Sequence, residues 1–461
     1  MLNNTKILGH RTQSVDSLMP NSGLSRLVAI EADSLKMVEV TWLYEGETES
    51  KIASTFIDTK PSKLLIVSTS NGEQVIINRR NFTSGYAGVH GMSAIVALKN
   101  DMSLSPWGDA YTNGTYPQIP QEDNHSVITL TGGTECFSAI RQDGSIFSWG
   151  DALYGGVLPA DLTGRTDIED VHYFADGIVL AKNAPHLVLW PGNIPQPPDY
   201  ITNMDNIIDV RITGNDGCVL TSDGKVHAWG NGFMSTIPLD IAQLSDIVSI
   251  HVNDAACVAL RATGELVGWG GEPYGGVIPD SVKSLTDIEK IICGQESFCV
   301  LRSSGSVISW GVAAEGGFTP ENILARSDIS DVIYVPGSNQ PPLGIKSAYV
   351  AICNDGSLCA WGGLQEVVNV PVVTDVISLS SCLTNCCALK KDGSVISWGQ
   401  EIDQTPVDEL LHNVCAVYAG TRSFIALKED NTIVVWGDPR EGGDMAAIPA
   451  DIQGNVSYYA S

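Results

Sequence analysis

Short apolar segments alternate with polar turns along most of this chain, and no window shows the sustained period of an amphipathic helix. In a representative stretch, an apolar segment at 257–260 is followed by a turn containing Gly264 and by an alternating segment that ends at Trp269. Glycine between two such segments is typical of a tight hairpin, because glycine adopts positive φ at little cost. A Gly-rich loop then ends at Pro279, and a third alternating segment follows at 286–292. The pattern predicts three strands and a connector that ends in proline.

This three-strand pattern recurs with a period of about forty residues. Its clearest mark is a Trp-Gly or Trp-Pro-Gly sequence, found at Trp107, Trp149, Trp190, Trp229, Trp269, Trp310, Trp361, Trp398 and Trp436. A unit of this length is too small to bury a core of its own, so neighbouring units must stack. The sequence therefore predicts an all-β repeat protein.

The two ends of the repeat region suggest how the array closes. The apolar segment 94–98 has no alternating segment clearly before it, whereas the alternating segment 455–459 has no apolar segment after it. We predict that the C-terminal segment completes the first blade, which removes the open edges of the array. The expected fold over residues 86–461 is a closed β-propeller of about nine short, three-stranded blades. A degenerate unit or a wider, imperfect ring is the alternative.

Residues 1–85 do not follow the repeat. Residues 1–21 are polar, whereas 26–81 show strand-like alternation and an Asn-Gly turn at 71–72. We predict a small N-terminal β domain, for which a sandwich is the preferred arrangement. The alternative is a degenerate pair of blade strands packed on the propeller.

The repeat motif supports a resemblance. Asp-Gly-x-Val-x-x-Trp-Gly is followed by Gly-Gly-Val-Ile-Pro or a close variant, most clearly at 149–159 and 269–279. Over residues 86–461 the chain resembles the regulator-of-chromosome-condensation repeat superfamily. Its short period resembles the three-stranded blades of the propeller-type β-lactamase inhibitory protein more than the longer units of the eukaryotic exchange factor. The resemblance implies binding through the propeller loops. It names no target, because relatives include nucleotide-exchange factors and enzyme inhibitors.

The chain is strongly acidic, with 26 Lys and Arg against 53 Asp and Glu and a formal net charge of −27. This balance argues against binding to the nucleic-acid backbone, which needs clustered basic residues, and against binding to an anionic membrane surface. The N-terminus lacks a signal-peptide core, and no stretch of about eighteen apolar residues is present. We expect a soluble protein that is cytoplasmic, or exported by a route without a classical signal peptide.

The 11 cysteines are interpreted as buried small apolar residues. Five recur at or near one place in the repeat, namely Cys136, Cys218, Cys257, Cys299 and Cys387. Cys382 and Cys386 cluster with Cys387 but lack Cys-x-x-Cys spacing. Nucleophile-elbow, Walker and His-Glu-x-x-His motifs are absent from the sequence. We expect no metal, no cofactor and no enzymatic activity, although a carboxylate pair for acid–base chemistry stays open.

Strand direction places the loops after each Trp-Gly on the same face as the turns between the first and second strands. Those loops carry many acids and several aromatic residues, and the only long insertion, at 336–344, projects from the same face. The predicted partner-binding residues are Tyr111, Asp151, Tyr154, Phe233, Glu272, Tyr274, Glu315, Asn339, Gln340, Pro341, Asp438 and Arg440. The alternative is that solvated loops are simply acidic in an acidic protein.

The preferred hypothesis is a non-enzymatic propeller that binds or inhibits a partner protein with a basic or mixed surface, steered by its acidic loops. One alternative is a glycan-binding module in which Tyr154 and Tyr274 are stacking planes. Another is a nucleotide-exchange factor for a small GTPase, with the insertion as a wedge.

Overall fold

The computed structural model describes most of the chain, namely residues 4–11, 25–85, 94–108, 119–133, 135–173, 177–337, 346–400 and 405–460. Within these residues the strands form ten three-stranded sheets and one four-stranded sheet. All strand pairs between named strands are antiparallel, and the helices are short, so the predicted all-β class is confirmed.

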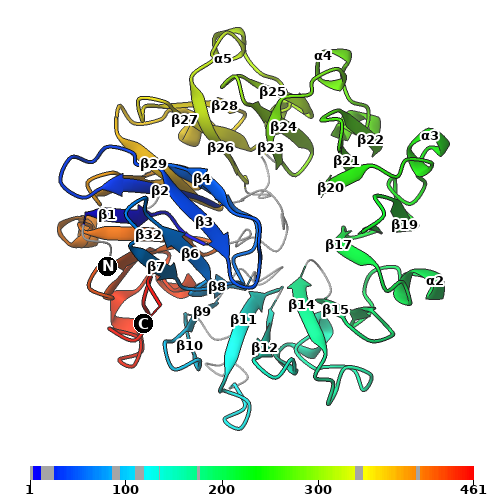
Figure 1. Ribbon diagram of the computed structural model, residues 1–461, viewed down its shortest axis with the longest axis horizontal. Helices are drawn as coiled ribbons and strands as arrows, with labels where there is room; N and C mark the ends of the chain where they lie inside the picture. Colours follow the sequence, from blue (N-terminus) through cyan, green and yellow to red (C-terminus); the bar gives the residue numbers. More distant parts are fainter. Residues whose placement is uncertain are drawn as a thin grey trace.

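Nine of the three-stranded sheets follow one another around a common centre, which is the arrangement of a β-propeller (Figure 1). Their first strands, which lie toward the centre, are β8 (Phe82–Ser84), β11 (Val127–Gly132), β14 (Ile168–Tyr173), β17 (Ile207–Ile212), β20 (Ile247–Val252), β23 (Ile288–Cys293), β26 (Ile329–Val335), β29 (Val376–Cys382) and β32 (Val414–Ala419). The middle strands are β9 (Ala94–Leu98), β12 (Cys136–Arg141), β15 (Gly177–Ala181), β18 (Asp216–Thr221), β21 (Ala256–Arg261), β24 (Ser297–Arg302), β27 (Ala348–Cys353), β30 (Asn385–Lys390) and β33 (Ser423–Lys428). The outer strands are β10 (Leu104–Gly108), β13 (Ile146–Gly150), β16 (Leu187–Trp190), β19 (Val226–Gly230), β22 (Leu266–Gly270), β25 (Val307–Gly311), β28 (Leu358–Gly362), β31 (Val395–Gly399) and β34 (Ile433–Gly437).

Short helical turns connect one repeat to the next. The α-helices are α2 (Asp199–Thr202), α3 (Leu239–Ala242), α4 (Asp280–Lys283), α5 (Glu321–Leu324) and α6 (Gln365–Val368). The 3-10 helices are η1 (Ala152–Tyr154), η2 (Glu272–Tyr274), η3 (Ala313–Glu315), η4 (Thr405–Leu410), η5 (Pro439–Glu441) and η6 (Met445–Ala447). In three connectors the predicted proline is the N-cap of the α-helix, at Pro238, Pro279 and Pro320. The N-cap of α2 is Pro198, three residues after the proline that the repeat pattern marks.

The repeat tryptophans join neighbouring repeats. The indole N–H of Trp190 donates to the Gly155 carbonyl of the preceding repeat at 2.9 Å, and Trp310 does the same to Gly275 at 3.0 Å. Equivalent bonds run from Trp229, Trp269 and Trp398 to the carbonyls of Pro195, Met234 and Val367. Each bond contributes about 1 kcal/mol net, in addition to the larger gain from burying the indole ring. The tryptophan is therefore an anchor between repeats.

The first and last repeats make the same contact. The indole N–H of Trp107 in β10 donates to the Gly442 carbonyl at 3.1 Å, although the two residues lie at opposite ends of the repeat region. Phe82 in β8 packs edge-on against Tyr418 in β32, with ring centroids 5.0 Å apart. These contacts bring the first sheet against the ninth.

The strand that completes the first sheet is not the one we expected. Strand β8, within the predicted N-terminal domain, pairs with β9, with Phe82 opposite Ala97. The C-terminal segment instead lies against residues 76–78, where Asn78 N–H donates to the Tyr458 carbonyl at 2.9 Å and Ile77 bridges to Tyr459. The prediction failed because β8 is only three residues long and too short to show alternation.

The N-terminal residues form two sheets that share one core. Their strands are β1 (Thr5–Leu8), β2 (Ser25–Glu31) and β5 (Thr55–Asp58) in one sheet, and β3 (Val40–Tyr44), β4 (Lys51–Ala53), β6 (Leu65–Ser68) and β7 (Gln74–Ile77) in the other. Trp42 of one sheet stacks on Phe56 of the other at 5.1 Å between centroids. This core continues into buried side chains of the last two repeats, including Ile377 and Val417. The N-terminal domain thus packs on β29 and β32 (Figure 1).

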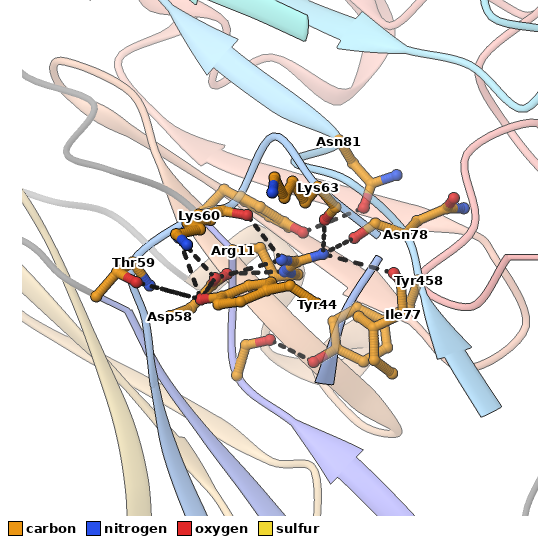
Figure 2. Close-up of polar contacts among 12 residues, drawn as sticks. Arg11, Tyr44, Asp58, Thr59, Lys60, Lys63, Ile77, Asn78, Asn81 and Tyr458 are labelled. Atoms are coloured by element: carbon orange, nitrogen blue, oxygen red, sulfur yellow. Dashed lines mark hydrogen bonds and ion pairs between the residues drawn. The ribbon is translucent and has the colours of Figure 1, made fainter. Parts of the chain in front are cut away.

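A buried ion pair lies at the centre of the N-terminal domain (Figure 2). Arg11 Nε donates to Asp58 Oδ2 at 2.7 Å, and the exposed fractions of the two side chains are 1% and 0%. The guanidinium also donates to backbone carbonyls, those of Lys60, Lys63 and Asn78 among them. The Tyr44 hydroxyl donates to Asp58 Oδ1 at 2.7 Å, and burial together with the Asp58 charge raises the pKa of Tyr44. Removing either charge would leave the other buried without a counter-ion.

We therefore expect Asp58→Asn to lower the free energy of unfolding by about 3–5 kcal/mol, because the Arg11 charge is then uncompensated. Chemical denaturation of the purified chain measures the change. Glu47→Gln, which removes the partner of the exposed Lys60, is the matched control and should change stability by less than about 1 kcal/mol. An Asp58→Asn variant as stable as this control would contradict the argument.

Candidate interaction face

The loops that follow each Trp-Gly lie against the turns between the first and second strands. Asp151 N–H donates to the Glu135 carbonyl at 2.8 Å, and Gly271 N–H donates to the Ala255 carbonyl at 2.8 Å. The same backbone bond recurs in further repeats, from Asn231 to Asn215, Val312 to Glu296, Gly363 to Ser347, Gln400 to Thr384 and Asp438 to Arg422. These bonds confirm that the two sets of loops share one face, as strand tracing predicts.

The loops are held in shape by local capping. The Asp151 carboxylate accepts a hydrogen bond from Leu153 N–H at 2.7 Å, and the Asp438 carboxylate accepts one from Arg440 N–H at 3.0 Å. The turn after η2 needs glycine, because Gly275 has a φ of +93° and an added Cβ would lie 2.8 Å from the Phe298 ring. Asp151 and Asp438 are therefore capping residues, as well as partly exposed charges on the face.

Four loops carry a side chain at the position before the glycine pair, at Tyr154, Tyr274, Glu315 and Glu441. The two tyrosines are half-buried and pack against the core between repeats. Glu315 is only 1% exposed, and its carboxylate accepts hydrogen bonds from Tyr334 Oη at 2.8 Å and Ser347 Oγ at 2.5 Å. The expectation that Glu315 is open to a partner therefore needs correction, since this loop position points inward.

Burial also changes the chemistry of Glu315. Desolvation raises the pKa of its carboxyl, and the charge of Glu296 adds to this effect, whereas the hydrogen bonds from Ser347 and Tyr334 oppose it. Desolvation likewise raises the pKa of Glu296. Two acids on this side of the molecule thus keep their protons to a higher pH than free glutamate.

An exposed aromatic side chain marks one part of the face. Phe233 is 64% exposed, and its ring lies 6.0 Å from the ring of Tyr274 in the next repeat. The loop that presents Phe233 is fixed by the buried Asp216 carboxylate, which accepts hydrogen bonds from Gly232 N–H at 2.6 Å and Met234 N–H at 2.9 Å. Asp216 thus stabilises the loop from inside and is not an exposed charge of the face.

Exposed acids adjoin this aromatic pair. Glu272 precedes Tyr274 within η2, and the turn containing Asp254 is joined to the same loop by the bond between Gly271 and Ala255. Both acidic residues are exposed. We call Phe233, Asp254, Glu272 and Tyr274 the Phe233–Tyr274 patch.

The other predicted residues lie in different repeats or outside the described residues. Asp151 and Tyr154 belong to the repeat of β11, β12 and β13. The exposed Arg440 guanidinium pairs with the Asp438 carboxylate at 2.9 Å in the last repeat, so its charge is largely balanced. Four of the predicted residues lie outside the described residues, namely Tyr111, Asn339, Gln340 and Pro341. The face thus carries separate groups of candidates instead of one cluster.

Sequence analysis overlooked a set of ionisable residues on the first strands of the repeats. Asp170 pairs with His172 at 3.1 Å, Asp209 with Arg211 at 3.0 Å, and Lys290 with Asp331 at 2.8 Å. The signal was available, because these polar residues interrupt otherwise apolar strands at equivalent positions. Their charges are mostly paired, and no group of three or more His, Cys, Asp or Glu side chains among the described residues has the geometry to hold a metal ion.

Comparisons with known proteins leave the family open. No protein-family model matches the chain, and no curated protein matches it. Similar solved structures include the ectodomain of the receptor kinase CR4 from Physcomitrella patens, with 17% identity, a TM-score of 0.36, and coverage of 78% of this chain and 72% of that one. The ectodomain of Arabidopsis thaliana ACR4 has 17% identity and a TM-score of 0.37, covering 69% and 95%. Yeast RCC1 (Prp20), solved with Kap60, has 14% identity and a TM-score of 0.33, covering 77% and 78%.

These likenesses are too distant to assign a partner, and membership of the repeat superfamily stays a prediction. Within the described residues, no helix is both long and apolar enough to cross a bilayer.

The burial of Glu315 predicts a pH-dependent stability difference. The pKa of Glu315 is higher in the folded state than in the unfolded state. The contribution of this carboxyl to the free energy of unfolding is therefore fully present below the unfolded pKa and is lost as the pH rises through the folded pKa. We expect the free energy of unfolding of Glu315→Gln, relative to that of the unchanged chain, to be higher at about pH 8 than at about pH 4. The difference should be about 1.4 kcal/mol per unit of pKa shift. Denaturant unfolding at both pH values measures it. Glu272→Gln, at an exposed position, is the control for loss of charge, and an identical response of both variants would contradict the prediction.

Proposed function

We propose that this protein is a non-enzymatic binding module whose Phe233–Tyr274 patch contacts a partner protein with a basic or mixed surface. The observation that carries the proposal is the exposed Phe233 ring, which neighbours the Tyr274 ring and stands on a loop whose backbone is fixed by Asp216. Rigid aromatic side chains supply contact area at low entropic cost, and such anchors commonly dominate interface energy. The buried Met234 beside Phe233 supports this rigidity, because it fixes the loop to the core.

The charge of the chain supports the choice of partner. The formal net charge is −27, and the acids nearest the aromatic pair, Asp254 and Glu272, are exposed. Acidic groups at the edge of an interface attract a basic partner and speed association more than they strengthen the final complex. A basic or mixed protein surface is thus the complement that this patch favours.

The proposal includes the architecture that presents the patch. We infer a closed ring of nine blades, supported by the bond from Trp107 to Gly442 and by the contact between Phe82 and Tyr418. A closed ring leaves no repeat without a neighbour on either side, and it holds each loop at a fixed place relative to its neighbours. The resemblance to repeat propellers that bind through their loops agrees with this use of the face.

The test compares binding by the unchanged chain and by a Phe233→Ala/Tyr274→Ala variant in affinity capture from a lysate, followed by titration of the captured protein. We expect the double variant to lose at least about tenfold in affinity, because it removes the aromatic anchor. The association rate should also fall as salt is raised, since screening weakens steering by the acids.

Tyr200→Ala is the matched control, because Tyr200 is 60% exposed but lies on α2, whose Thr202 carbonyl accepts a hydrogen bond from His186 N–H at the opposite, hairpin end of a sheet. A captured protein bound equally by all three chains would place the interface elsewhere. Absence of any protein partner, together with glycan binding that is lost in the double variant, would favour the glycan-binding alternative. Turnover that depends on the exposed acids would contradict the non-enzymatic assignment.

A further inference from the structure

The last residue of each middle strand, or the one after it, lies diagonally across the hairpin from the second residue of the outer strand. In six repeats this side chain is basic, at Lys99, Arg141, Arg261, Arg302, Lys390 and Lys428. The Arg141 guanidinium lies over the Phe147 ring at 4.5 Å from its centroid, and Arg302 pairs with Asp287 at 2.9 Å. In the repeats of Arg141, Arg261 and Arg302, the cation thus lies beside an apolar residue and pairs with an aspartate that precedes the first strand.

The repeat of β26, β27 and β28 departs from this arrangement at both positions. Cys353 replaces the basic residue and Cys359 replaces its apolar neighbour, and their sulfur atoms are 4.0 Å apart. The cation is still present, because Arg326 pairs with Asp328 at 2.7 Å and also donates from Nη2 to Cys353 Sγ at 3.0 Å. The two thiols are therefore adjacent to each other and to a guanidinium.

Other described cysteines of the repeats have different surroundings. Cys257, Cys299 and Cys386 lie within middle strands, where burial raises the pKa of their thiols. The hydrogen bond with Cys359 and the nearby Arg326 charge lower the pKa of Cys353 to about 7, while the same pairing raises the pKa of Cys359. One thiol is thus disposed to be the thiolate, and the other stays protonated beside it, which is the order that stepwise oxidation needs.

We propose that Cys353 and Cys359 form a reversible dithiol–disulfide centre that is oxidised by small hydroperoxides. In the first step the Cys353 thiolate attacks the O–O bond of the hydroperoxide, forming a sulfenic acid at Cys353 and releasing hydroxide or alkoxide. In the second step the Cys359 sulfur attacks the sulfenic sulfur, so that an S–S bond forms. The hydroxyl group leaves with the Cys359 proton as water. The two sulfurs together lose two electrons, and the hydroperoxide gains them.

Access and geometry are compatible with this chemistry. Cys353 is only 1% exposed, but Cys359 is partly exposed and the Arg326 side chain is 31% exposed, so solvent reaches the group from their side. This opening favours a small oxidant. The sulfur atoms must approach from 4.0 Å to about 2.0 Å, and the pair lies beside the hairpin turn, at the end of the strand ladder.

The experiment uses the full chain, reduced and then exposed to hydrogen peroxide. Digestion before Asp355, which lies between the two cysteines, separates them into different peptides, so mass spectrometry detects the disulfide as a linked pair. We expect this linked pair to form, and to be reversed by a dithiol reductant, while Cys257 stays reduced. Oxidation of Cys257 at the same rate, or a disulfide between other cysteines, would overturn the proposal.

Variants test the role of each group. Cys359→Ser should stop at a sulfenic acid on Cys353 that a dimedone probe captures, whereas Cys353→Ser should give neither product. Arg326→Gln should slow oxidation near neutral pH several-fold and shift the pH profile of the rate upward, while Arg326→Lys should largely restore both. Thermal unfolding confirms that each variant is folded. Equal rates in Arg326→Gln and the unchanged chain, or no sulfenic acid in Cys359→Ser, would contradict the mechanism.

Discussion

The hydrogen bond from a repeat tryptophan to the loop of the preceding repeat is the constraint on which the architecture depends. Each repeat is too small to hold a core alone, so its stability lies in the contact with its neighbour. In several repeats the indole N–H reaches a backbone carbonyl at the equivalent place, as Trp190 reaches Gly155 and Trp310 reaches Gly275. The loop is therefore fixed by the same contact that joins the repeats, and whatever it exposes is presented rigidly.

This constraint explains what the sequence could predict. Trp-Gly marks, hairpin glycines and connector prolines depend on local backbone geometry, so they revealed the strands, their order and the face shared by the loops. Strand β8 was missed because Phe82–Ser84 is defined by its pairing with β9, which no local pattern shows. The formation of β8 thus depends on tertiary pairing and not on a local sequence pattern.

The candidate residues were harder to predict, because exposure depends on the neighbouring repeat. Glu315 occupies the same loop position as Tyr154 and Tyr274, whose side chains point toward the next repeat. Its carboxylate is therefore buried, although an acidic loop residue is usually exposed. An alignment of the repeats carries this signal, because the three residues occupy the same position. Cys353 is a similar case, because it occupies a position that is basic in most repeats, although the cysteines as a group were interpreted as buried apolar residues.

The position of the N-terminal domain has a consequence for how the molecule opens. Neighbouring repeats are joined by the chain itself except where the first sheet meets the ninth, so separation would begin most readily there. The domain shares its core with the last two repeats, and it runs directly into β8 of the first. The domain therefore contacts both sides of the boundary between the first and the ninth sheet, where the chain supplies no covalent link. Both contacts must break before the two sheets can separate. We therefore expect the domain to slow local opening at this boundary and to lengthen the lifetime of the folded molecule against proteases, even where it changes the free energy of unfolding little.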